Sequence, residues 1–163
     1  MVKITFTTGE EYALKLSRLG DYSESIVKRA LKEGAKIAAD EIRRRLTALG
    51  TEKFRYLRDG KKFKGPSKSQ IKDLSDSFGI SPVKLRKDGV WDVRIGFDGY
   101  GSFPTHQYPN GVPNILLARS IESGASVRRK RPFIRPAMEA KETEIIAAME
   151  RVIDEEIEKI MKG

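Results

Sequence analysis

The sequence ARSIESGASVRRKRPFIRPA occupies residues 118–137, and it decides how we expect the chain to fold. Pro132 and Pro136 each restrict φ and bias the residue before them toward extended backbone. Phe133 therefore lies in a stiffened segment, where it is a candidate anchor into a hydrophobic core. Because proline is favoured in the first turn of a helix, the pattern predicts that a helix begins at Pro136.

Glu122 interrupts the apolar residues at the start of this stretch. A buried carboxylate needs a partner, so we expect Glu122 to pair with Arg119 or Arg135 in a structural ion pair rather than to act as a catalyst. The expected structural anchors are Glu122, Gly124, Pro132, Phe133, Arg135 and Pro136.

Two long segments have apolar residues at three- and four-residue spacings, which indicates amphipathic helices. One covers residues 23–49 and the other residues 137–161, where acidic residues fall largely outside the apolar stripe. A shorter helix is expected over residues 10–18. Gly20 is expected to end it, and Asp21 or Ser23 to cap the next helix.

Alternating apolar residues predict strands over residues 77–86 and 90–97, joined by a tight turn at Asp88-Gly89. Residues 2–7 have the same alternation and predict a short strand. The apolar run at residues 115–121 fits either a strand or a short helix, and we predict a strand.

The segment between these elements, residues 98–114, is rich in Gly, Pro, Tyr and Asn and has no clear period. Its length predicts a loop of functional or interface importance. With 163 residues, the chain is expected to form one domain over residues 1–163. The predicted fold class is α+β, with a small antiparallel sheet packed against two long helices and a long basic loop.

That basic loop, residues 50–72, concentrates lysine and arginine around Gly and Pro, and we interpret it as a mobile arm. Phe54, Tyr56 and Phe63 lie among the cations, a combination typical of nucleic-acid contacts. Two other interpretations stay open: a solvated loop with its rings folded back on the body, and a segment that orders against neighbouring subunits.

A second basic cluster lies directly before Pro132, where it either docks phosphates or an acidic helix, or only keeps the loop soluble. The candidates for subunit or DNA contact from both basic stretches are Lys53, Arg55, Arg58, Lys61, Lys62, Lys64, Arg128, Arg129, Lys130 and Arg131. The chain has 32 Lys and Arg against 23 Asp and Glu, a formal net charge of +9, which favours acidic partners without choosing among them.

The sequence offers little for catalysis. It has no cysteine and one histidine, His106, which excludes disulfides, thiolate-bound zinc and most nucleophilic mechanisms. No phosphate-binding glycine loop or nucleophile elbow occurs. Asp73 with Asp76, or Asp92 with Asp98, would be the only carboxylate pairs for a metal-dependent nuclease, and isolated acids near strands are usually surface residues. We expect no enzyme, no cofactor and no metal.

No apolar run is long enough to span a bilayer, and the first residues lack the apolar core of a secretory signal. We therefore expect no membrane partner and a soluble protein made in a cytoplasm.

Three features together resemble a known family. These are the Ile121-Glu122-Ser123-Gly124 step, the motif that runs from Arg131 to Ala137 before a helix, and Leu74-Ser75-Asp76-Ser77-Phe78 after the first long helix. The pattern, from residue 23 to the end, resembles the tail-component (neck) family of long-tailed bacteriophages. Ala125, where the family usually has Thr, and the length of the basic loop depart from it.

The resemblance implies a structural morphogenesis protein of the head-tail junction, a neck or tail-completion component that assembles as a ring. It further implies, as partners, other copies of the chain, the connector or head-closure proteins and tail proteins, with non-specific DNA contact as a further hypothesis. The implied location is the virion of a phage or prophage, after assembly in the host cytoplasm. The alternative function is a sequence-independent nucleic-acid-binding module that uses the basic arm.

Overall fold

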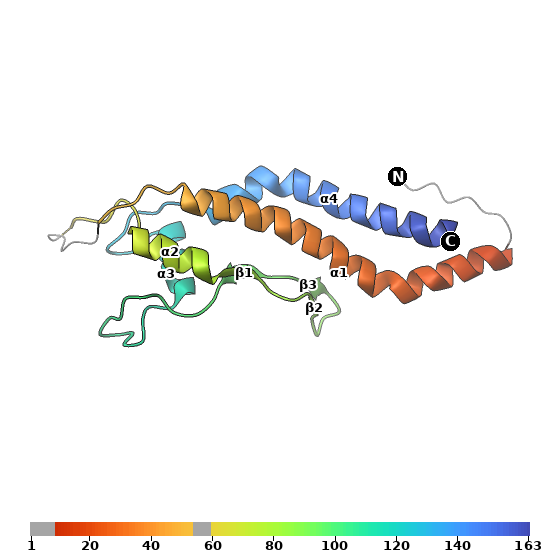
Figure 1. Cartoon of the computed structure of the whole chain (residues 1–163), viewed down its shortest axis with the longest axis horizontal. Helices are drawn as coiled ribbons and strands as arrows, with labels where there is room; N and C mark the ends of the chain where they lie inside the picture. Colours follow the sequence, from red (N-terminus) through yellow and green to blue (C-terminus); the bar gives the residue numbers. More distant parts are fainter. Residues whose placement is uncertain (1–8, 54–59) are drawn as a thin grey trace. The chain divides into compact units, whose positions relative to one another are not determined.

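The computed structural model describes residues 9–53 and 60–163, with side chains from Arg18 onward. In this part of the chain, two helices are followed by the strands of two small antiparallel sheets and then by two more helices (Figure 1), which confirms the α+β prediction. The predicted strand at residues 2–7 lies outside the described residues. In chain order the elements are α1 (Gly9–Thr47), α2 (Lys68–Ser77), β1 (Phe78–Ile80), β2 (Lys84–Leu85), β3 (Trp91–Asp92), β4 (Ile95–Phe97), α3 (Asn114–Ser123) and α4 (Ile134–Lys162).

Helix α1 is one continuous helix of 39 residues, so the predicted break at Gly20 is wrong. Glycine in a helix interior costs only about 0.5–1 kcal/mol relative to alanine, which the surrounding turns can offset. Ser23 is not a cap either, because its hydroxyl donates to the Gly20 carbonyl 2.8 Å away, within the helix.

The predicted antiparallel pairing is confirmed, but each long strand is split in two. β1 pairs with β4, Phe78 opposite Phe97, and β2 pairs with β3, Leu85 opposite Trp91. The tight turn is also as predicted: Gly89 has φ +81° and its N–H donates to the Arg86 carbonyl, 3.0 Å away.

Three further expectations need correction. The run at residues 115–121 is part of helix α3 instead of a strand, with Leu117, Ala118 and Ile121 buried on one face. The basic loop is shorter than predicted, because α2 begins at Lys68 behind a capping box between Ser67 and Gln70. Helix α4 begins at Ile134, two residues before Pro136.

The chain divides into two compact units. Unit 1 comprises Met1–Ile37, Pro82–Arg94 and Glu142–Gly163; unit 2 comprises Ala38–Ser81 and Ile95–Lys141. The prediction of a single domain over residues 1–163 stays a prediction.

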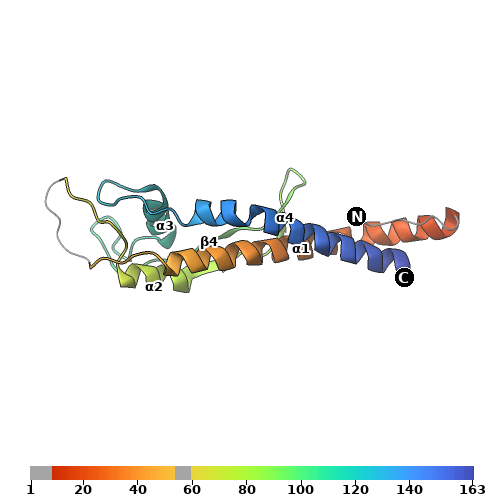
Figure 2. The ribbon, with the colours of Figure 1, turned by 90° about the horizontal axis from the view of Figure 1, so that it is seen from above.

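In unit 1, α1 and α4 lie side by side (Figures 1 and 2), and Ile26, Ala30, Ala148 and Val152 are among their buried residues. The helices approach closely at Gly34, where an added Cβ atom would lie 2.9 Å from the Met149 sulfur. Arg29 of α1 pairs with Glu156 of α4. The Lys28 ammonium of α1 lies 5.2 Å from the centre of the Trp91 ring, in β3.

Unit 2 has its own hydrophobic core, formed where the end of α1 meets α2, β1, α3 and the start of α4. Phe133 is fully buried there, at 0% exposure, with its ring 6.2 Å from the Phe97 ring in an edge-on arrangement. The buried core residues are Ala39, Ile42, Leu46, Leu74, Phe78, Leu117, Ala118, Ile121, Phe133 and Ala137.

Candidate functional site

The stretch that connects α3 to α4 is held by the Glu122 carboxylate. It accepts hydrogen bonds from the backbone N–H groups of Phe133 and Ile134, at 2.7 and 2.9 Å, and from that of Arg135, at 2.9 Å. The N–H groups at a helix start have no partner within the helix, and a negative charge there is favoured by the helix dipole. The expected ion pair of Glu122 with an arginine side chain is thus replaced by a cap on α4.

The basic loop that follows α3, residues 124–131, is folded as a tight turn. Ala125 and Arg128 exchange backbone hydrogen bonds of 2.9 and 3.1 Å. Gly124 has φ +81°, and a Cβ atom there would lie 3.1 Å from the Lys130 nitrogen, so the turn requires glycine.

Arg128 is turned inward, with 7% of its surface exposed. Its guanidinium donates to the Gly65 carbonyl, 3.3 Å away, and to the Gln70 side-chain oxygen, 3.2 Å away. Burial lowers the pKa of Arg128, and the nearby Glu52 carboxylate opposes part of that effect. The side chain joins the loop to the start of α2, and it is not presented to a partner.

The second half of the basic arm lies against this loop. Phe63 donates its N–H to the Val127 carbonyl and accepts from the Arg129 N–H, both at 2.9 Å. Next to this bridge, the Arg131 guanidinium donates to the Lys64 carbonyl, 2.8 Å away. The structure therefore brings together two basic stretches that are separated by about sixty residues in the sequence.

Together these stretches form one exposed surface, which we call the basic surface: Lys61, Lys62, Lys64, Arg129, Lys130 and Arg131. An open concavity is lined by Lys62, Arg129, Lys130 and the backbone around Gly124. Lys53, another predicted contact, is exposed at the start of the arm. Arg55 and Arg58 lie outside the described residues.

The net charge of the chain is carried by unit 2. Unit 2 contains 18 Lys and Arg against 9 Asp and Glu, whereas unit 1 contains 14 of each.

Several large apolar residues of unit 2 are exposed. Tyr100, Phe103 and Ile115 are 66%, 55% and 54% exposed, and Leu116 follows directly in α3. Tyr100 bridges to Pro113, and Asp73 fastens the loop by accepting from the Ser102 N–H at 2.8 Å. The loop at residues 98–114 thus presents apolar side chains on a fixed backbone.

The acids considered for a metal site have other partners. Asp73 holds Ser102, Asp76 pairs with Lys72 at 2.6 Å, and Asp98 accepts from the Gly99 N–H. Within residues 9–53 and 60–163, no group of three or more potential ligands gathers around a common point.

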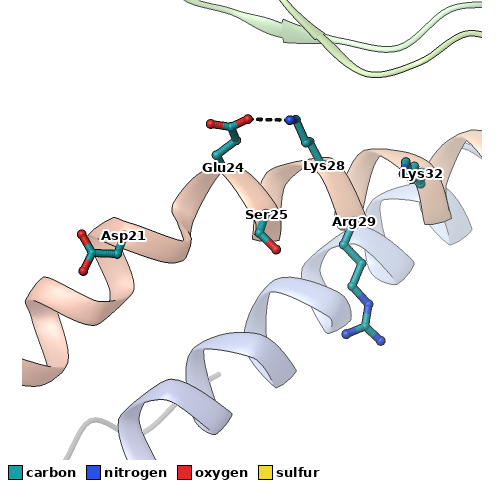
Figure 3. Close-up of a pocket in the computed structure, with 6 residues that line it drawn as sticks. All are labelled: Asp21, Glu24, Ser25, Lys28, Arg29 and Lys32. Carbon is teal, nitrogen blue, oxygen red and sulfur yellow. Dashed lines mark hydrogen bonds and ion pairs between the residues drawn. The ribbon is translucent and has the colours of Figure 1, made fainter.

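Another concavity lies along α1 in unit 1 (Figure 3), lined by Asp21, Glu24, Ser25, Lys28, Arg29 and Lys32. Its charges are largely compensated locally. Glu24 pairs with Lys28, and Arg29 extends toward α4, where it pairs with Glu156. This arrangement stabilises the helix surface and leaves little net charge for a ligand.

Comparison with known proteins identifies a related family. A family model described as "Bacteriophage HK97-gp10, putative tail-component" matches residues 10–99, which is more than half of the chain. Neither the curated proteins nor the solved structures include a match to this sequence. Among the described helices, none has an apolar stretch that could cross a membrane.

Proposed function

Because this chain belongs to the HK97-gp10-like family of phage tail components, we propose that it is a structural protein of the head-tail junction that completes the tail or neck by forming a ring. The match over residues 10–99 carries this proposal. The mechanism is assembly rather than turnover, so the protein is not an enzyme.

A ring requires that each subunit carry two different, complementary surfaces. The exposed apolar residues Tyr100, Phe103, Ile115 and Leu116 support one of them, since large apolar side chains left in water gain free energy when a partner covers them. We assign this surface to the contact with the next copy of the chain. The loop is already held by Asp73, so little order has to be gained on assembly.

In this proposal the other partners are the connector or head-closure proteins on one side and tail proteins on the other. The ring forms in the host cytoplasm and stays in the virion. A phage and a prophage origin are both compatible with this role.

The experiment compares Ile115→Asp with Val90→Asp, since Val90 is similarly exposed, at 51%, but belongs to unit 1. Sedimentation velocity of the full chain should show a multi-subunit species for the unmodified protein and for Val90→Asp. For Ile115→Asp it should show mainly single subunits. An unchanged mass for Ile115→Asp would place the subunit contact elsewhere.

A further inference from the structure

We propose that the basic surface of unit 2 binds the phosphate backbone of nucleic acid without regard to base sequence. This goes beyond the assembly role, since it assigns a ligand class and the residues that contact it. The central cations are Lys62, Arg129 and Lys130, which line one concavity.

The central cations of the basic surface have no acidic partner among the described residues. Within the described part of the chain, no acidic side chain pairs with Lys62, Arg129 or Lys130, although eleven described ion pairs occur elsewhere, from Glu24–Lys28 to Glu158–Lys162. Several close cations repel one another, which costs free energy unless a polyanion is bound. The whole excess of nine positive charges lies in the unit that presents them.

The obvious protein partner, the acidic helix α4 of a second copy, fits less well. Glu156 pairs with Arg29 and Lys159, Glu158 pairs with Lys162, and Glu155 lies 4.0 Å from Arg151. Unit 1 as a whole has as many basic as acidic residues, so the acids of α4 belong to a unit without net charge. A phosphate backbone, with regularly spaced charges, fits better.

The surface is also preorganised. The buried Arg128 side chain, the glycine turn at Gly124 and the Phe63 bridge fix the backbone from which the cations extend. A fixed backbone reduces the ordering entropy lost on binding. Arg128 is therefore a positioning residue, while its neighbours Arg129 and Lys130 contact the ligand.

The test is fluorescence anisotropy of a labelled, random-sequence DNA duplex titrated with the full chain between about 50 and about 200 mM salt. The surface variant is Lys62→Gln with Arg129→Gln and Lys130→Gln. The control is Lys36→Gln with Lys84→Gln and Lys87→Gln, which removes three exposed charges from unit 1 and gives the same net charge.

Each phosphate contact contributes about 0.9 to the slope of log affinity against log salt. If all three side chains contact phosphates, the slope for the surface variant is smaller by about 2.7. Between the lowest and the highest salt, its affinity then falls by a factor about 40 times smaller than that of the unmodified protein. The control should keep the slope of the unmodified protein.

The proposal fails if the unmodified protein does not bind the duplex at the lowest salt, or if both triple variants lose the same slope, which would indicate a net-charge effect. It also fails if the surface variant keeps its DNA affinity but loses the multi-subunit mass, because the surface would then be a subunit contact. DNA binding and mass are separate readouts, so failure of one proposal does not hide failure of the other.

Discussion

At the scale of single residues, Glu122 organises the junction between α3 and α4. It binds three consecutive N–H groups, and the next residue, Pro136, has none to satisfy. The Glu122 carboxylate and Pro136 therefore account for the backbone positions at the start of α4 whose N–H groups would otherwise have no partner within the helix. This explains why the helix can begin before Pro136 and why Phe133 has a fixed approach to the core.

Replacement of Glu122 by alanine should therefore destabilise unit 2. The loss of a charged cap typically costs about 1–3 kcal/mol of unfolding free energy. Glu122→Gln should cost less, since its amide oxygen still accepts. Urea unfolding measures the effect, with Glu139→Ala as control, since Glu139 is an exposed acid of α4, the helix that Glu122 caps. Equal midpoints for Glu122→Ala and Glu139→Ala would contradict the capping role.

Glu41 predicts a dependence on pH. Hydrogen bonds from Arg44 and then Arg45 lower the pKa of this carboxyl from 4.5 to about 2. Because the folded state holds the proton less tightly than the unfolded state, this stabilisation is present above pH 4.5 and is lost as the pH falls toward about 2.

Urea midpoints measured from about pH 7 down to about pH 2 should fall more steeply for the unmodified protein than for Glu41→Gln, which has no carboxylate to protonate. Glu33→Gln, on the same helix, should keep the unmodified profile. If the urea midpoints of the unmodified protein and of Glu41→Gln fell in parallel, the pairs of Glu41 with Arg44 and Arg45 would contribute nothing to stability.

At the scale of elements, the two glycines of α1 have different roles. Gly20 has no atom within 4 Å of the position its Cβ would occupy, whereas at Gly34 that position is 2.9 Å from the Met149 sulfur and 3.2 Å from Ile145. Gly34 therefore permits the close approach of α1 and α4 within unit 1, and Gly20 does not serve packing.

Leucine at the two positions should act in opposite directions. Gly20→Leu should stabilise the helix by about 0.5–1 kcal/mol, because leucine has the higher helix propensity. Gly34→Leu should destabilise unit 1 by about 1–3 kcal/mol, because the added side chain overpacks the helix contact. Thermal unfolding by circular dichroism compares them. A stabilising Gly34→Leu would mean that α1 and α4 do not pack closely there.

The elements also show what the sequence can predict. The three- and four-residue spacing of apolar residues in α4 is sufficient to predict a helix, and the Asp88-Gly89 pair is sufficient to predict a hairpin, because both signals are local. The prediction of a strand at residues 115–121, within α3, is wrong because a short apolar run does not distinguish strand from helix, and the contacts of Leu117 and Ile121 come from other elements.

At the scale of the whole chain, composition alone predicts the two basic stretches as candidates for contact. It does not predict that they form one surface, because the bridge between Phe63 and Arg128 joins residues far apart in the sequence. Nor does it distinguish Arg128, which is buried, from Arg129 and Lys130, which are exposed. Those differences depend on the tertiary fold.

In the proposed function, this member of a tail-component family acts by assembling with copies of itself. The most direct test is its solution mass by light scattering across a concentration series, at low and high salt. We expect one discrete species at a multiple of 18.4 kDa that persists on dilution into the micromolar range. A mass of 18.4 kDa at every concentration and both salt levels would contradict it.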